Sequence, residues 1–346
     1  MRSTIALEDV ATKLEVSVST VSRALRGVPG IHPATRQKVM AEALRLGYVP
    51  QRRAGANEAR AVRARQILVL SAGSSTPGGY LHGLSGAASE AGVTLQMHHT
   101  PLDKCMELLR PGSCPPSLRD KSCDGVILIY HWPTEIVAAL SGGFPVVSMM
   151  HDYAGSAIDV VGIDSFGGMK DIVRNLAALG HRRIGFYGLM PEISWARDRF
   201  GAFAEAIVAE GLTLDMEQVV SISHVPNDPH PFEAQEHAAS RVEAGVKSGV
   251  RAWVAADDFL GYRLGEALIR AGLSIPRDVS IAGFHRHAYV HASSVPVLTS
   301  TEVDNENIGR LALRQMLQRI NGDKGPPLVL RAPAKFAAGE SCAAAS

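Results

Sequence analysis

Residues 7–27, LEDVATKLEVSVSTVSRALRG, carry two short amphipathic helical patterns separated by a break. Apolar residues recur at helical spacing from Leu7 to Leu14. After the break at residues 15–16, a second pattern opens at Ser17, and serine is a residue type that caps helices. The stretch therefore predicts a helix-turn-helix.

The second helix of this pair would present short polar side chains and an arginine on the side away from its apolar residues. Arginine can hydrogen-bond to guanine O6 and N7, and serine or threonine can bond to base edges or phosphates. We therefore expect this helix to enter the major groove of DNA. The candidate contact residues in and just after it are Ser17, Val18, Ser19, Thr20, Ser22, Arg23 and Arg26.

A third helix is predicted from Pro33, a residue favoured at the first helical position, to Gly47, which would end it. Residues 1–50 together predict an all-α helix-turn-helix DNA-binding domain. The alternative is a small helical bundle that has no part in DNA binding.

Charge is distributed unevenly along the chain. Residues 1–65 contain 12 Lys and Arg against 5 Asp and Glu, whereas the rest contains 23 against 29, so a net charge of +1 hides a basic head on an acidic body. A basic head concentrates the attraction to phosphate at one end of the molecule.

Short apolar runs alternate with helix-length amphipathic stretches from Gln66 onward. This alternation predicts right-handed βαβ units and parallel sheets, and about 280 residues favour two α/β lobes. We expect a linker at 51–65 and an effector-binding and dimerisation core at 66–346. The first lobe would hold residues 66–164 and 298–325, and the second 165–297 and 326–341. A ligand would bind at the carboxyl ends of the strands.

Composition narrows the class of protein. Hydrophobic residues make up 46% of the chain, yet no apolar run approaches the 18 or more residues of a membrane span, and no secretory signal opens the sequence. We expect a soluble cytoplasmic protein that does not engage membranes. The four cysteines have no metal-ligand spacing and are interpreted as free thiols.

Enzyme motifs are absent from the sequence: it contains no HExxH, GxSxG, GxxxxGK[ST] or strand-following GxGxxG pattern. His98 and His99 are adjacent on a probable strand, so their side chains would point to opposite faces and chelate a metal poorly. We therefore predict no catalytic residues, no metal site and no cofactor.

The head motif, together with RQKVMAEALRLGYVPQ at 36–51, resembles the headpiece of the lactose-repressor (LacI/GalR) family of bacterial transcription regulators. The similarity continues at CDGVILI (123–129), LGHRRIGFYG (179–188), ARDRFGAFAEAI (196–207), the stretch 255–284 and PVLTSTEVD (296–304). The resemblance covers nearly the whole chain. It implies a periplasmic-binding-protein-like core of two α/β lobes behind the helix-turn-helix head.

Four head residues match DNA-contacting positions of that family, namely Thr20, Ser22, Arg23 and Thr35, and His32 stands where the family usually has a serine. In the family the linker forms a hinge helix on DNA, and a leucine from it wedges into the minor groove. Here Asn57 replaces that leucine. Arg52 and Arg53 would bind phosphates or enter a narrow minor groove, unless the segment is only a flexible basic tether.

The resemblance also locates candidate effector-binding residues. Arg199 matches an arginine that bonds ligand hydroxyls or carboxylates, and Asp257 matches a position usually held by Asn or Asp. Two usual acids are missing, because Met150 and then His151 follow one strand and His285 follows another. We expect such a cleft to favour an anionic or aromatic ligand. The alternative is that His285 and His287 are solvated loop residues outside the cleft.

Three further residues complete the predicted effector site. Trp195 either stacks on a ligand ring or plugs the interface between the lobes, and Ser71 and Ser74 follow the first strand of the core.

These features predict a sequence-specific transcription regulator, most simply a repressor. Its affinity for a pseudo-palindromic double-stranded operator would be controlled by a small-molecule effector, namely a sugar or sugar derivative, anionic ones included. Since one recognition helix reads few base pairs and the C-terminal tail lacks leucine heptads, we expect a homodimer. The alternative is a ligand-binding regulatory protein that has lost specific DNA binding.

Overall fold

The computed structural model describes residues 7–25, 31–46, 65–73, 76, 78–153, 155–222, 231–286 and 294–345. The chain divides into two compact units, Met1–Arg63 and Ala64–Ser346, which we call the head and the core.

The head contains three helices: α1 (Leu7–Leu14), α2 (Val18–Leu25) and α3 (Pro33–Leu46). Glu15, with φ of 54°, makes the turn between α1 and α2. Each helix contributes one apolar face to a small shared interior, which confirms the predicted helix-turn-helix. The buried residues of this interior are Val10, Ala11, Val21, Ala24, Val39 and Ala43.

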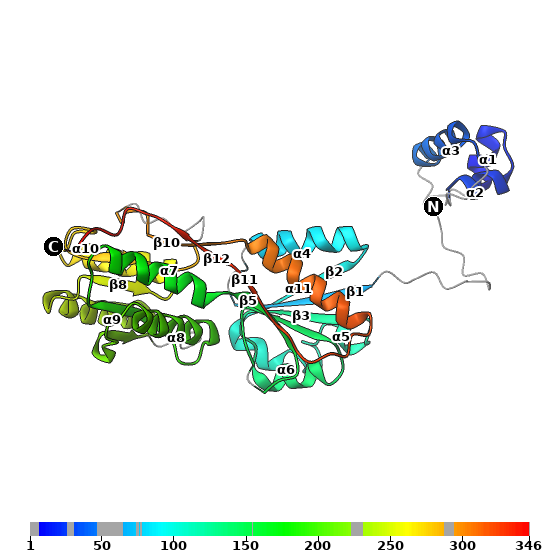
Figure 1. Ribbon diagram of the computed structural model, residues 1–346. Coiled ribbons are helices and arrows are strands. Elements are labelled where there is room, and N and C mark those ends of the chain that lie inside the picture. The colour runs from blue at the N-terminus through cyan, green and yellow to red at the C-terminus, as the bar shows by residue number, and fades with distance from the viewer. Residues whose placement is uncertain are drawn as a thin grey trace. The chain divides into compact units, whose positions relative to one another are not determined.

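The first lobe of the core is a six-stranded parallel sheet with the order β11-β5-β4-β3-β1-β2. Figure 1 shows α4 and α11 on one face of this sheet and α5 and α6 on the other. The elements are β1 (Gln66–Ala72), α4 (Gly78–Ala91), β2 (Thr94–Thr100), η1 (Leu102–Glu107), α5 (Pro116–Arg119), β3 (Gly125–Ile129), α6 (Thr134–Ser141), β4 (Val146–Met149), β5 (Asp159–Ile163), α11 (Asn305–Ile320) and β11 (Val329–Ala332).

The continuous apolar run of β1 follows from this two-sided cover. Successive strand residues point to opposite faces of a sheet. Ile67 and Val69 therefore join one buried cluster, which also holds residues of α4 and α11, and Leu68 and Leu70 join a second cluster with residues of α6.

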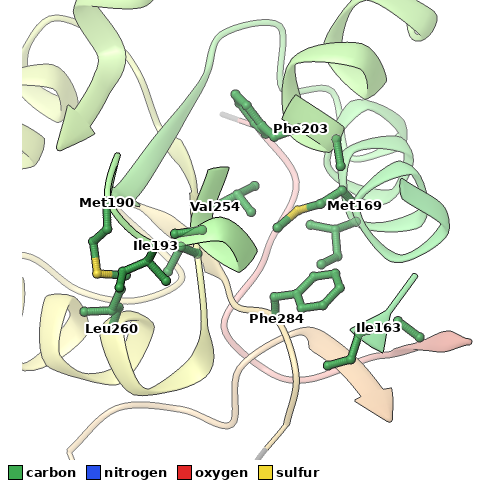
Figure 2. Packing of buried hydrophobic residues seen from close by; sticks show 14 of the residues in the cluster. Ile163, Met169, Met190, Ile193, Phe203, Val254, Leu260 and Phe284 are labelled. Carbon is green, nitrogen blue, oxygen red and sulfur yellow. The ribbon is translucent and has the colours of Figure 1, made fainter. Parts of the chain in front are cut away.

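The second lobe is built on a smaller parallel sheet with the order β7-β6-β8-β9. The larger buried cluster extends into this lobe, and Figure 2 shows part of it, with Phe284 and Met169 of the second lobe and Ile163 at the end of β5. The elements are α7 (Ser165–Ala178), β6 (Ile184–Leu189), α8 (Ser194–Ala209), η2 (Met216–Gln218), β7 (Val219–Ser221), α9 (Pro231–Lys247), β8 (Ala252–Ala255), α10 (Asp258–Arg270) and β9 (Ser280–Ala282).

The lobes are joined by β10 (Ser300–Val303) and β12 (Ala334–Ala337), which pair antiparallel, and by the chain after β5. Here the lobe boundaries differ from those expected. Residues 329–332 form β11, an edge strand of the first lobe's sheet, rather than part of the second lobe. Residues 300–303, expected in the first lobe, pair instead with β12, and Thr299 pairs with Ala282 of the second lobe.

Candidate functional site

Six of the predicted DNA-contacting residues lie on α2 or at its N-terminal cap. Ser17 caps the helix, since its Oγ accepts a hydrogen bond from the Thr20 amide at 3.1 Å. Ser19 and Thr20 each hydrogen-bond to the Ser17 hydroxyl at 2.8 Å. Val18, Ser19 and Arg23 are exposed, whereas Thr20 and Ser22 are half-buried. The helix therefore presents a small polar surface that ends in a guanidinium.

His32 and Thr35 lie at the beginning of α3. His32 is exposed, and its Nδ1 accepts a hydrogen bond from the Ala34 amide at 3.3 Å, so the ring caps this helix. Thr35 is half-buried. The predicted site residues Arg26, Arg52, Arg53, Asn57 and Ser74 lie outside the described residues, as does His287.

A cavity of about 200 Å³ lies between the two lobes of the core. The first lobe lines it from α4 and from the residues that follow β3 and β4, and the second lobe lines it from α8, the beginning of α10 and the residues after β9. This is the carboxyl edge of both parallel sheets, where ligands bind in such folds. The lining residues are Tyr80, Tyr130, Met150, Trp195, Arg199, Asp257 and His285.

Arg199 is the cation of this lining, and its surroundings are unusual for a charged group. The residue is 3% exposed, and its guanidinium carbon lies 4.6 Å from the centre of the Trp195 ring and 4.5 Å from that of Phe284. Within the part of the chain that the structure describes, Arg199 makes one hydrogen bond, 2.7 Å long, to the Ala256 carbonyl, and its Nε is buried without a hydrogen-bond partner. Burial lowers the pKa of Arg199 to about 10, so the group is charged at neutral pH.

Two adjacent aspartates follow β8 and have different roles. Asp257 lines the cavity and caps α10, because its Oδ1 accepts a hydrogen bond from the Leu260 amide at 2.8 Å. Asp258 is 1% exposed and accepts a hydrogen bond from the Ser300 hydroxyl. Burial raises the pKa of Asp258 to about 7, and the neighbouring Asp257 charge adds to this shift.

His285 is a buried residue of the cavity wall, at 4% exposure, so the solvated-loop alternative is wrong for it. Its amide donates to Thr301 Oγ1 at 3.0 Å, and its Nε2 lies 2.9 Å from Asn305 Oδ1. Its φ of 65° is in the left-handed region, as are those of Tyr130 (67°) and Met150 (69°). Non-glycine residues in this region are uncommon and cluster at functional sites, and here three of them line one cavity.

His151 does not fulfil the role expected of it. The residue is 6% exposed and lies beside the cavity rather than in its lining. Its Nδ1 is 3.0 Å from the Ser194 hydroxyl, which also accepts a hydrogen bond from the Asp152 amide. Burial lowers the pKa of His151 to about 3, so the ring is neutral at physiological pH and offers no charge to an anion. The residue instead ties the loop after β4 to the first turn of α8.

The structure thus brings together Trp195, Arg199, Asp257 and His285, whereas Ser71 lies outside the lining, hydrogen-bonded to Thr76. Trp195 both contacts Arg199 and lies at the junction of the lobes. Sequence reasoning missed Tyr80 and Tyr130. The signal for Tyr130 was its position directly after the buried strand GVILI, and Tyr80 had none.

Within the described residues, no group of three or more His, Cys, Asp or Glu side chains is arranged to hold a metal ion. The same residues include no helix that is long and apolar enough to cross a membrane.

Comparison with known proteins finds matches for both the head and the core. Residues 6–51 match bacterial regulatory proteins of the lacI family, and residues 173–342 match a periplasmic binding protein-like domain. The chain is 26% identical over 336 residues to the HTH-type transcriptional regulator GntR of Escherichia coli K12, covering 94% of both chains. It is 29% identical over 338 residues to the HTH-type transcriptional regulator CelR of Thermobifida fusca, again covering 94% of both.

Solved structures show the same fold over the whole chain. The lac repressor dimer bound to operator and the anti-inducer ONPF matches with a TM-score of 0.73 at 19% identity, covering 99% of this chain and 100% of that one. The CelR–cellobiose complex matches with a TM-score of 0.67 at 24% identity, covering 97% and 99%. The chain thus combines a helix-turn-helix head that matches bacterial regulatory proteins of the lacI family with a periplasmic-binding-protein-like domain, and the relatives that it matches over 94% of its length are transcription regulators.

Proposed function

We propose that this regulator is a repressor whose affinity for operator DNA is controlled by a small effector bound between the lobes of its core. The effector is a sugar or sugar derivative, and the cavity favours one that carries a carboxylate or phosphate. The regulator acts as a homodimer, with two heads on a pseudo-palindromic operator.

Arg199 is the observation that supports the cavity as the effector site. A buried charge is costly unless it is paired, and within the described residues Arg199 forms no ion pair. Its orphaned Nε keeps an unused hydrogen-bond donor. An anionic group of a ligand would supply both the counter-charge and the acceptor.

The rest of the lining suits a compact ring. Tyr80, Tyr130 and Trp195 offer aromatic faces and polar tips. Burial raises the pKa of Tyr130 to about 12, and it also raises that of Tyr80, so both hydroxyls remain protonated donors at neutral pH. A volume of about 200 Å³ is below the ~300–1,000 Å³ of sites for drug-sized ligands, which favours a single ring.

DNA recognition is tested first, by selecting binding sites from random duplex DNA at about 150 mM salt, where nonspecific phosphate attraction is partly screened. We expect enrichment of one pseudo-palindrome. Failure to enrich any site, with and without the sugars below, would overturn specific DNA binding.

The selected site then allows a test of the recognition helix. Arg23→Ala should lose about 1–3 kcal/mol of discrimination at one base pair. Arg45→Ala is a matched control that removes the same charge from the head, because Arg45 lies at the end of α3 and pairs with Glu42 at 2.6 Å. It should leave the preferred sequence unchanged, and equal behaviour of the two variants would contradict base recognition by Arg23.

The effector class is tested by thermal shift with D-glucose, D-gluconate and D-glucose 6-phosphate. We expect at least one anionic probe to raise the melting temperature of the wild type but not that of Arg199→Met. Stabilisation by neutral glucose alone would contradict the anionic part of the proposal, and an unchanged shift in the variant would contradict the role of Arg199.

A further inference from the structure

Helix α11 contacts the cavity wall at its first residue. Asn305 begins the helix, and its Oδ1 lies 2.9 Å from Nε2 of His285, which lines the cavity from the second lobe. A left-handed backbone and the hydrogen bond from its amide to Thr301 fix the position of His285. A ligand that contacts His285 is thus one hydrogen bond away from α11.

The other end of α11 contacts the residue at which the chain enters the core. Asn321 caps the helix, and its side-chain oxygen accepts a hydrogen bond from the Arg65 guanidinium. Arg65 directly precedes β1, and its carbonyl accepts a hydrogen bond from the Thr94 amide at 2.9 Å. In the sequence, the segment N-terminal to Arg65 leads to the DNA-binding head.

Between these ends α11 is one continuous helix of 16 residues, about 24 Å long. It packs so closely on α4 that a Cβ on Gly83 would collide with the Glu306 carbonyl, and one on Gly309 would collide with the Tyr80 carbonyl. Tyr80 itself lines the cavity. We expect the two helices, which lie side by side in Figure 1, to move together. Helix α4 contributes Tyr80 to the cavity lining, and α11 contacts the lining residue His285 through Asn305.

The last turn of α11 is anchored to the sheet. Arg319 holds the buried Asp159 of β5 by two hydrogen bonds of 2.7 Å, from Nε to Oδ2 and from a terminal nitrogen to Oδ1. Asn321 follows this anchor at the C-terminal end of α11, whereas Asn305 lies at the N-terminal end.

We propose that α11 is a lever that couples the effector cavity to Arg65, with Asp159–Arg319 as its fulcrum. A ligand that changes the His285–Asn305 bond tilts the helix, and the tilt changes the Asn321–Arg65 bond at the start of β1. His285, Asn305, Asn321 and Arg65 are positioning residues in this coupling. The inference rests on the proposed effector site, but its test uses the ligand-free protein and can fail independently.

Hydrogen–deuterium exchange of the full chain tests the lever from the cavity end. His285→Asn keeps a residue type that tolerates the left-handed backbone but is too short to reach Asn305. We expect amides at 305–308, at 319–323 and at 65–67 to exchange about fivefold faster, the factor that corresponds to losing one neutral hydrogen bond. Faster exchange confined to residues near 285 and 305 would overturn the lever.

A matched control separates this effect from general destabilisation. His181 is another buried histidine of the second lobe, and its Nε2 is 3.0 Å from the Ala343 carbonyl. His181→Asn should leave exchange at 319–323 and 65–67 unchanged. An equal response to both variants would mean that the far end of α11 reports stability rather than coupling.

The reciprocal variant tests the lever from the exposed end, where folding is not at risk. Coupling between two sites acts equally in both directions. Asn321→Ala should therefore accelerate exchange of the His285 amide and of 305–308, whereas Asn305→Asp, which keeps an acceptor for His285, should behave as wild type. No change at 285 and 305 in Asn321→Ala would overturn the proposal.

Discussion

Asp159 and Arg199 are both buried charged residues of the core, yet within the described residues Asp159 has an ion pair and several hydrogen bonds, whereas Arg199 has one hydrogen bond and no ion pair. Asp159 is 2% exposed and accepts hydrogen bonds from the Arg319 guanidinium, the Gln315 amide group and the Leu328 backbone. These bonds hold the pKa of Asp159 below its usual range, against the opposing effect of burial. Arg199, at 3% exposure, has two aromatic rings and one carbonyl.

The difference separates a structural charge from a functional one. Removing one partner of a buried, satisfied pair leaves an uncompensated charge, whereas an unpaired buried charge is already a cost to the fold. Unfavourable features of this kind cluster at functional sites, where a ligand supplies the missing partner of the charge. The paired site ties α11 to β5 and β11, and the unpaired one faces the cavity between the lobes.

The largest effect is expected at the paired site. Asp159→Ala should lower the free energy of unfolding by about 3–5 kcal/mol, because it removes the ion-pair partner of Arg319 and leaves the buried Gln315 amide group and the Leu328 backbone amide without their acceptor. Chemical denaturation measures this loss. Asp120→Ala is the control, since Asp120 pairs with Arg119 at 2.9 Å but both side chains are more than half exposed, and about 1 kcal/mol or less is expected there. Similar losses at both positions would remove the distinction.

The predictable parts of the molecule are those in which neighbouring residues carry the information. The helix-turn-helix could be predicted because Ser17 caps its own helix and the apolar residues of α2 recur within a few positions. The alternation of strands and helices in the core could be predicted for the same reason, since each element's pattern lies within a short stretch of sequence. Arg199 and Asp257 could be proposed from family resemblance because their neighbouring residues match the family; Asp257 caps α10, and Arg199 lies in the second turn of α8.

Contacts between distant segments could not be read in this way. The predicted lobe of β11 was wrong, because β11 is a half-exposed edge strand and its sequence carries no pattern that favours one sheet over the other. The position of His151 after a strand predicts a ligand role, but its contact with Ser194, 43 residues away, holds it outside the cavity lining. The left-handed backbone at Tyr130, Met150 and His285 could not be predicted either, because none of the three residues is a glycine.

Asp258 sharpens the comparison because its pairing is intermediate, a single hydroxyl from Ser300. Its pKa rises from 3.8 to about 7 on folding, so the folded protein keeps a proton that the unfolded chain has lost. This group therefore lowers stability as pH rises from about 4 to 7, by about 1.4 kcal/mol per pH unit where it titrates only in one state. Asp258→Asn should flatten that part of the stability profile.

The measurement is chemical denaturation of wild type and Asp258→Asn between pH 4 and 8. The variant should match the wild type near pH 4 and exceed it at pH 8. Asp171→Asn is the control, since the Asp171 side chain is about half exposed, at 46%, and it should follow the wild-type profile. A parallel profile for Asp258→Asn would contradict a raised pKa at Asp258.

The smallest effect on stability is expected at Arg199. Replacing Arg199 and Arg319 in turn by methionine tests the comparison directly. Arg199→Met removes a buried charge that forms no ion pair within the described residues, although the Asp257 carboxylate lies in the same lining, and it leaves an apolar chain between Trp195 and Phe284. The free energy of unfolding should therefore stay within about 1 kcal/mol of wild type or rise. Arg319→Met leaves Asp159 buried and unpaired, and should cost about 3–5 kcal/mol. Calorimetry of both variants without added ligand gives the answer. Equal losses would show that Arg199 is a structural charge like Arg319, and the case for an anion in the cavity would then lose its main support.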